Sequence, residues 1–148
     1  MTTNTIVQEY SVALAALLAH GGYERTGDTT EAKRWDIDHI VTYLNEAGRP
    51  DARYTVHIAG SKGKGSIATM VDSILRASGE HTLLLTSPDL HEARERIRID
   101  GTTVAYTEFT ALANRLLADP AAANWSYFEL LTMMGWFAGA QNSCTWQI

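Results

Sequence analysis

The residues best suited to chemistry form a glycine-rich segment, GSKGKGS, at residues 60–66. Glycines let the backbone turn tightly and point its N–H groups inward, and a lysine adds a full positive charge. The N-terminus of a following helix would add a partial positive charge at the same place. These groups together can bind phosphate, so the segment predicts a phosphate-binding loop.

This segment differs from the common phosphate-loop pattern GxxxxGK[ST] at two positions. Ile58 stands where the first glycine is expected, and Gly65 stands where a hydroxyl residue should follow the lysine. A hydroxyl comes one place later, at Ser66. The alternative is a flexible surface loop without a ligand, but a strand before the segment and a helix after it favour phosphate binding.

The flanking sequence predicts that strand and that helix. Residues 54–59 are rich in β-branched side chains, which predicts a buried strand. Apolar residues at helical spacing continue from Ile67 to Leu75, and the near-continuous apolar run at 81–86 predicts a second strand. Strand, loop, helix and strand make a βαβ unit, with a right-handed crossover and a parallel sheet buried on both faces.

Further helices and a hairpin are predicted around this unit. Apolar spacing predicts helices at residues 6–19, 35–44, 107–117 and 126–138. The polar residues 23–30 read as a loop, and 96–104 read as a hairpin that turns at Asp100-Gly101. The last residues, 145–148, are typical of a strand that has just begun. We therefore expect a piece of a longer protein, with a central strand left unpaired and poor folding of this piece alone.

Composition narrows the function classes. The 148 residues suffice for one domain, and 45% of them are hydrophobic, which excludes disorder over the whole chain. A net charge of −5, from 12 basic and 17 acidic residues, argues against general nucleic-acid binding. The single cysteine, Cys144, excludes an internal disulfide. The N-terminus has neither a signal-peptide pattern nor the ~20 apolar residues that cross a bilayer. We expect a cytoplasmic protein that binds neither nucleic acid nor membrane.

Four segments, in the same order along the chain, resemble the folylpolyglutamate synthase/dihydrofolate synthase family of the Mur-ligase superfamily. They are VHIAGSKGKGS (56–66), LLLTSPDL (83–90), ERIRIDG (95–101) and YFELLT (127–132). Residues 23–28, YERTGD, are similar to the opening segment of that family. The resemblance covers residues 10–148. It implies an α/β fold, a P-loop-type parallel sheet flanked by helices as in the central domain of Mur ligases, here apparently truncated.

The resemblance also implies a domain organisation. Residues 1–148 would be the N-terminal portion of an ATP-binding domain, and the glutamate-binding C-terminal domain would be absent. Within it we expect a helical lead-in at 1–52, a P-loop βαβ unit at 53–90, and the hairpin and helices at 91–144. The family's next strand carries a metal-binding glutamate, which lies beyond Ile148.

The activity implied by the resemblance is that of an ATP-dependent ligase, which joins L-glutamate to the carboxylate of a folate or of dihydropteroate. Such enzymes use ATP and Mg²⁺ to form an acyl phosphate, from which the glutamate amine displaces phosphate. We expect the present chain to be inactive alone and the full-length form to be monomeric. Two alternatives stay open: another Mur-type or P-loop ATP-dependent carboxylate ligase, and an inactive nucleotide-binding fragment or interaction module.

Individual roles follow from the resemblance. The ATP phosphates would be held by Gly60, Ser61, Lys62, Gly63, Lys64, Gly65 and Ser66. Lys64 would be the catalytic phosphate lysine, and Ser66 would lie near phosphate or metal. Ser87 would ligate Mg²⁺, since a hydroxyl is a hard oxygen ligand. Phe128 would stack on the pterin, with a plain core aromatic as the alternative.

Two residues depart from the family pattern. Lys62 stands where the family usually has asparagine, and it can either strengthen phosphate binding or face solvent. Asp89 stands where the family usually has histidine. A turn-forming role after Pro88 is the favoured reading of Asp89, with metal ligation or altered substrate handling as the alternatives.

The other notable residues are expected to be structural. His57 reads as a packed or edge histidine within its strand, and Arg96 and Arg98 as the exposed face of the hairpin. Glu129 reads as the capping-box partner of Ser126. Core positions are expected for Met133, Met134 and Trp136.

Overall fold

A computed structural model of the chain describes residues 2–21 and 37–148. Its centre is a five-stranded sheet in the order β1-β5-β2-β3-β4. The strands are β1 (Tyr54–Thr55), β2 (Thr82–Leu85), β3 (Ile97–Ile99), β4 (Thr102–Thr103) and β5 (Trp146–Gln147). β1, β5 and β2 are mutually parallel, whereas β3 and β4 form the predicted hairpin and run antiparallel. The chain is a mixed α/β fold, as expected.

The predicted βαβ unit is present, but its two strands are not neighbours. Helix α4 (Lys64–Ala77) connects β1 to β2, and β5 lies between these strands. Trp146 lies opposite Tyr54 on one side and opposite Thr82 on the other. The expectation of an unpaired central strand is therefore wrong, because β5 pairs with both of its neighbours.

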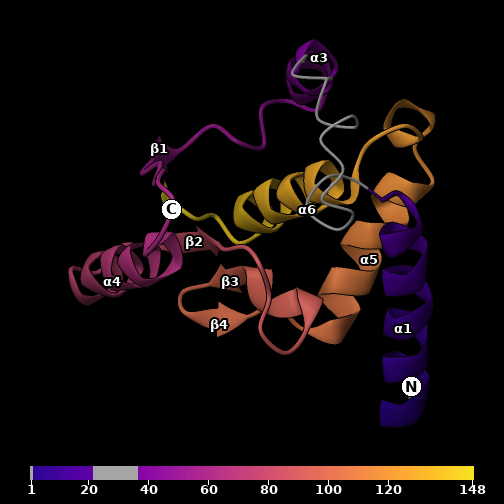
Figure 1. The fold of residues 1–148 in the computed structure, drawn as a ribbon, viewed down its shortest axis with the longest axis horizontal. Coiled ribbons are helices and arrows are strands. Elements are labelled where there is room, and N and C mark those ends of the chain that lie inside the picture. The colour runs from indigo at the N-terminus through magenta and orange to yellow at the C-terminus, as the bar shows by residue number, and fades with distance from the viewer. Residues whose placement is uncertain (1, 22–36) are drawn as a thin grey trace.

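Besides α4, the helices are α1 (Thr3–Ala19), α3 (Asp38–Glu46), α5 (Tyr106–Leu117) and α6 (Tyr127–Gln141), with 3₁₀ turns η2 (Ala93–Arg96) and η3 (Pro120–Ala122). Helix α4 packs on β2, α6 packs on β2 and β3, and α1 packs on α5 and α6 (Figure 1). Helix α5 begins before Thr107, which was the expected cap. The predicted loop at 23–30, the YERTGD segment at 23–28 and the first residues of the predicted helix at 35–44 lie outside the described residues.

The apolar core lies among α1, α5, α6 and the β2–β3 pair. Phe109 and Leu116 of α5 are fully buried, as are Met133 and Met134 of α6, which confirms the two methionines as core residues. Full burial of one such side chain contributes about 1.5–3 kcal/mol. The core therefore fixes α6 on the sheet, and α6 forms one wall of the site described below.

Side chains of β1 and α4 are more exposed to solvent than the sequence predicts. Tyr54 of β1 is 69% exposed, and residues 56–59 continue as extended chain outside the strand. Ile67 and Ile74 of α4 are also exposed, whereas Asp72 of the same helix is buried. The expected parallel sheet with both faces buried is thus wrong for β1, which lies at the edge with β5 as its strand neighbour. α4 lies at the opposite end of the molecule from α1 (Figure 1).

Across residues 2–21 and 37–148, no helix combines the length and the apolar character needed to cross a membrane.

Candidate active site

The glycine-rich segment forms a tight turn that leads directly into α4. Gly60 and Gly63 have φ angles of +146° and +77°, a region that other residues enter only with strain. Gly63 is the N-cap residue of α4, which begins at Lys64. The first turn of α4 therefore has its unpaired N–H groups at the loop, as a phosphate-binding loop requires.

Lys64 folds back over this loop. Its Nζ donates a hydrogen bond of 2.7 Å to the carbonyl oxygen of Gly60. The ammonium group is thus held above the loop, close to the N-terminus of α4, and the side chain remains exposed. A full and a partial positive charge lie together at this point.

A pocket of about 600 Å³ opens beside the loop, where the parallel strands end. Its walls include Gly60, Lys64 and Gly65 from the loop, Ser87 from the segment after β2, and Phe128 from α6. These five residues come from three separate motifs and were all predicted to be functional. The carboxyl ends of parallel strands are the usual place for ligands in open α/β sheets.

Other predicted residues do not contribute to this pocket. Ser61, Lys62, Gly63 and Ser66 are exposed and are not among its lining residues. For Lys62, the orientation toward solvent agrees with the second of its two expected roles. The predicted position of Ser66 near a metal stays a prediction.

Helix α6 adds two side chains to the site, Thr132 and Trp136, that were not predicted from the sequence. Together with the predicted Phe128 they line the pocket at spacings of four residues. Phe128 is 51% exposed and Trp136 is half-buried, so neither is a plain core residue. Helical spacing counted from Phe128 is the sequence signal that predicts this shared face. His57, expected to be a packed or edge histidine within its strand, lies just after β1, is exposed and also lines the pocket.

No protein-family model matches the sequence. Two curated relatives align with most of the chain. One is a probable bifunctional folylpolyglutamate synthase/dihydropteroate synthase of Haloferax volcanii, 43% identical over 107 residues, covering 68% of this chain and 13% of the relative. The other is a folylpolyglutamate synthase of Arabidopsis thaliana, 36% identical over 111 residues, covering 72% of this chain and 18% of the relative.

Solved structures agree with these relatives. A Mycobacterium tuberculosis folylpolyglutamate synthase complexed with ADP is 28% identical with a TM-score of 0.68, and the match covers 91% of this chain and 32% of that one. An FPGS–AMPPCP–folate complex is 27% identical with a TM-score of 0.73, and the match covers 93% of this chain and 34% of that one. Over the part that it spans, this chain belongs to the folylpolyglutamate synthase family. It spans less than a fifth of the two curated relatives and about a third of the two solved chains.

The segment after β2 is closed into a loop by a glutamate. Glu95 Oε1 accepts hydrogen bonds from the backbone N–H groups of Leu90 and His91. The bond from Leu90 is the main cause that lowers the pKa of Glu95 below its ordinary value of 4.5. The carboxylate of the ERI segment therefore shapes the loop that presents Ser87.

Asp89 turns toward Arg96. Arg96 Nε donates to Asp89 Oδ1 at 2.5 Å. Arg96 was expected on the exposed face of the hairpin, but it is buried in η2, and Arg98 is half-buried. The hairpin is shorter than predicted because Arg96 belongs to the 3₁₀ turn before it, and its side chain turns inward to the aspartate.

The start of α6 is fixed by the predicted capping box. Ser126 Oγ accepts from the Glu129 N–H at 3.3 Å, and Glu129 Oε2 accepts from the Ser126 N–H at 2.7 Å. The other oxygen of Glu129 lies 3.1 Å from Nε2 of His39 in α3. This arrangement holds Phe128, in the first turn of α6, at the mouth of the pocket.

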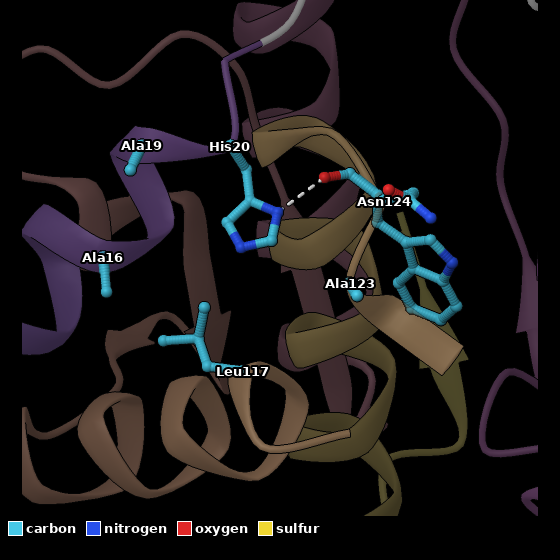
Figure 2. Close-up of a pocket in the computed structure, with 7 residues that line it drawn as sticks. Ala16, Ala19, His20, Leu117, Ala123 and Asn124 are labelled. Atoms are coloured by element: carbon cyan, nitrogen blue, oxygen red, sulfur yellow. Dashed lines mark hydrogen bonds between the residues drawn. The ribbon is translucent and has the colours of Figure 1, made fainter. Parts of the chain in front are cut away.

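A second hollow, of about 690 Å³, lies between α1, the end of α5 and the segment before α6. Figure 2 shows the His20 ring turned toward the Trp125 carbonyl, 2.8 Å from Nδ1 to O. Most of the other lining residues have apolar side chains, and three of them are alanines. This hollow contains one histidine, whose ring already contacts a backbone carbonyl oxygen, and that is not sufficient for a catalytic site.

Proposed function

We propose that this chain supplies the ATP-phosphate and folate-facing part of an ATP-dependent ligase that joins L-glutamate to a folate. The main support for the proposal is that Lys64, Ser87 and Phe128 line the same pocket. These residues were assigned by sequence to phosphate, metal and pterin, and the fold brings them together from different elements. The matched FPGS–AMPPCP–folate complex supports the same pair of ligands.

The loop supplies the positive charge that phosphoryl transfer needs. The substrate carboxylate attacks the terminal phosphorus of ATP, so that ADP leaves and an acyl phosphate forms. The glutamate amine then attacks the acyl carbon, an amide bond forms, phosphate leaves, and the amine loses a proton. Lys64 and the N–H groups at the start of α4 would neutralise charge on the transferring group, and the loop would hold it in position.

The residues around the loop fit a Mg²⁺ ion that is held mainly by ATP and water. No cluster of three or more His, Cys, Asp or Glu side chains that could hold a metal occurs among the described residues. Mg²⁺ typically keeps several waters and binds substrate phosphates with few protein ligands. Ser87 would provide a hydroxyl ligand, and the bound ion would neutralise phosphate charge.

The α6 wall suits a flat, elongated substrate. Phe128 and Trp136 lie two helical turns apart, about 12 Å along the axis at 1.5 Å per residue. Both aromatic residues line the pocket, and Arg53 donates a hydrogen bond to the carbonyl oxygen of Trp136. Two aromatic faces along one wall can contact the rings of a folate.

The ligase reaction itself gives the test. The longest form of the protein would be incubated with ATP, Mg²⁺ and glutamate, and with either tetrahydrofolate or dihydropteroate, while ADP and glutamylated products are measured. We expect ADP formation that depends on both glutamate and one of the two pteridines, with one glutamate added for each ADP.

Other outcomes would favour the alternatives. ADP formation with a different carboxylate substrate, and none with either pteridine, would indicate another Mur-type ligase. ATP binding without ligation of any glutamate would indicate a nucleotide-binding module and would contradict the proposal.

A further inference from the structure

The segment that carries Ser87 is held at both ends by one residue, Arg96. At its start, the N–H of Thr86 donates to the Arg96 carbonyl oxygen at 3.1 Å. At its end, Asp89 Oδ1 accepts from Arg96 Nε at 2.5 Å. Ser87 lies between these two attachments and lines the pocket. A displacement of Arg96 therefore moves the backbone on both sides of Ser87.

The ion pair lies in a mostly buried place. The side chains of Arg96 and Asp89 are 9% and 31% exposed. The guanidinium group also lies 5.4 Å from the ring centre of Tyr127, which precedes Phe128 in α6. Removal of the Asp89 charge takes an ion-pair partner away from this buried guanidinium group, so the group is expected to shift.

We propose that Asp89 and Arg96 are positioning residues that set the place of the Ser87 hydroxyl for Mg²⁺·ATP. This inference rests on the proposed function, in which Ser87 contacts the metal. Asp89 would act through Ser87 and would not contact the metal itself, because its carboxylate is turned toward Arg96. The histidine-to-aspartate departure from the family pattern is thereby given a structural role.

The test measures how Mg²⁺ strengthens ATP binding to the chain, by calorimetric titration of ATP at a series of Mg²⁺ concentrations. Substitution of residues that orient metal ligands typically costs about 10–100-fold in metal affinity. Asp89→Asn is therefore expected to raise the Mg²⁺ concentration of half-maximal effect by roughly 10–100-fold, with ATP affinity in EDTA unchanged. Ser87→Ala should do the same, and the double variant should be no worse than Ser87→Ala alone.

A neighbouring ion pair offers a matched control. Arg94 and Glu92 of the same segment form a pair at 2.5 Å, with side chains 12% and 34% exposed, and neither residue lines the pocket. Glu92→Gln should leave the Mg²⁺ response unchanged. Asp89→Glu, which keeps the carboxylate, should restore most of the response lost in Asp89→Asn.

The outcomes separate this inference from the proposed function. ATP binding by the parent chain together with an unchanged Mg²⁺ response in Asp89→Asn would overturn the inference alone. Additive losses in the double variant would also overturn it, because Asp89 would then not act through Ser87. Absence of ATP binding by the parent chain would overturn both. If Asp89→Asn does not fold, Asp89→Ser removes the same charge with another residue that suits a turn, and it should also raise the Mg²⁺ requirement.

Discussion

Individual residues in this chain divide into those whose role is local and those whose role depends on a distant neighbour. Gly63 turns the backbone through its positive φ, and Lys64 brings its charge to the start of α4. Both properties belong to the residue itself, so the sequence predicts where in the turn each residue lies. Trp136 was expected in the core; it is half-buried, packs against the core and also lines the pocket, because its exposure depends on what lies opposite α6. The Asp89–Arg96 pair escaped prediction because the turn at η2 that brings it together has no simple sequence pattern.

At this scale the folate end of the pocket can be tested through Phe128. Phe128→Ala should weaken binding of tetrahydrofolate, because an aromatic contact contributes about 0.5–1.5 kcal/mol beyond area burial, or about two- to tenfold in affinity. ATP affinity should not change. Fluorescence titration of tetrahydrofolate, with and without ATP, measures both.

Phe128→Leu provides the control, since it keeps apolar area without a flat ring and should recover only part of the loss. Because Phe128 is 51% exposed, none of these variants should change the melting temperature appreciably. Equal folate affinity in Phe128→Ala and the parent chain would remove Phe128 from the substrate site.

At the scale of elements, apolar periodicity predicts the helices well, and the predicted hairpin and capping box are present. The strands were harder, because strand length depends on partners far away in the sequence. β1 has only two paired residues, since its neighbour β5 offers only two. Residues 56–59 were predicted as strand from their side chains, but only Val56 continues the pairing, through its N–H to the Gln147 carbonyl oxygen at 2.8 Å.

The close approach of α6 to the sheet depends on Gly139. A Cβ atom there would lie 2.9 Å from Cζ of Arg53 and 2.9 Å from Cδ2 of the fully buried Leu83. Gly139→Ala should destabilise the chain by about 1–3 kcal/mol through overpacking, even though alanine favours a helix by about 1 kcal/mol. Urea unfolding followed by circular dichroism measures the change.

Ala140→Gly, at the exposed neighbour in the same helix, measures the intrinsic helix preference in this setting. A Gly139→Ala variant that is more stable than the parent chain would show that α6 does not pack this closely on β2.

The turn between β3 and β4 is predicted to stabilise the fold in a pH-dependent manner through Asp100. Burial raises the pKa of Asp100, but hydrogen bonds from His81 and the Thr82 N–H, with the charge of Arg76, outweigh it and lower the pKa below 3.8. A lowered pKa gives a stabilisation that is fully present above 3.8 and is lost as the pH falls through the folded-state value. Asn tolerates the φ of +48° at this position.

Asp100→Asn should therefore melt at a lower temperature than the parent chain near neutral pH. The difference between the two melting temperatures should disappear below pH 3.8. Thermal unfolding from about pH 7 to about pH 2 tests this. Glu9→Gln, on an exposed face of α1, controls for the loss of one carboxylate. A gap that stays constant through the acid range would contradict the assignment.

For the whole molecule, the sequence predicts the α/β class and the place of the glycine-rich loop before α4, but not the order of the strands in the sheet. The position of β5 between β1 and β2 brings Ile148 to the same pocket as Gly60 and Ser87, and no local pattern specifies such a pairing. The family relationship explains why motifs spread over 80 residues meet at one pocket. The central claim is that this pocket holds the phosphates of ATP through Lys64.

Calorimetric titration of Mg²⁺·ATP into the parent chain, Lys64→Ala and Lys62→Ala tests that claim most directly. A charge-assisted contact contributes about 1.5–3 kcal/mol, so Lys64→Ala should weaken ATP binding by about tenfold to more than a hundredfold. Lys62 is a matched lysine in the same loop that does not line the pocket, and Lys62→Ala should bind ATP nearly as the parent chain does. Equal ATP affinity in Lys64→Ala and the parent chain, or the larger loss in Lys62→Ala, would contradict the account.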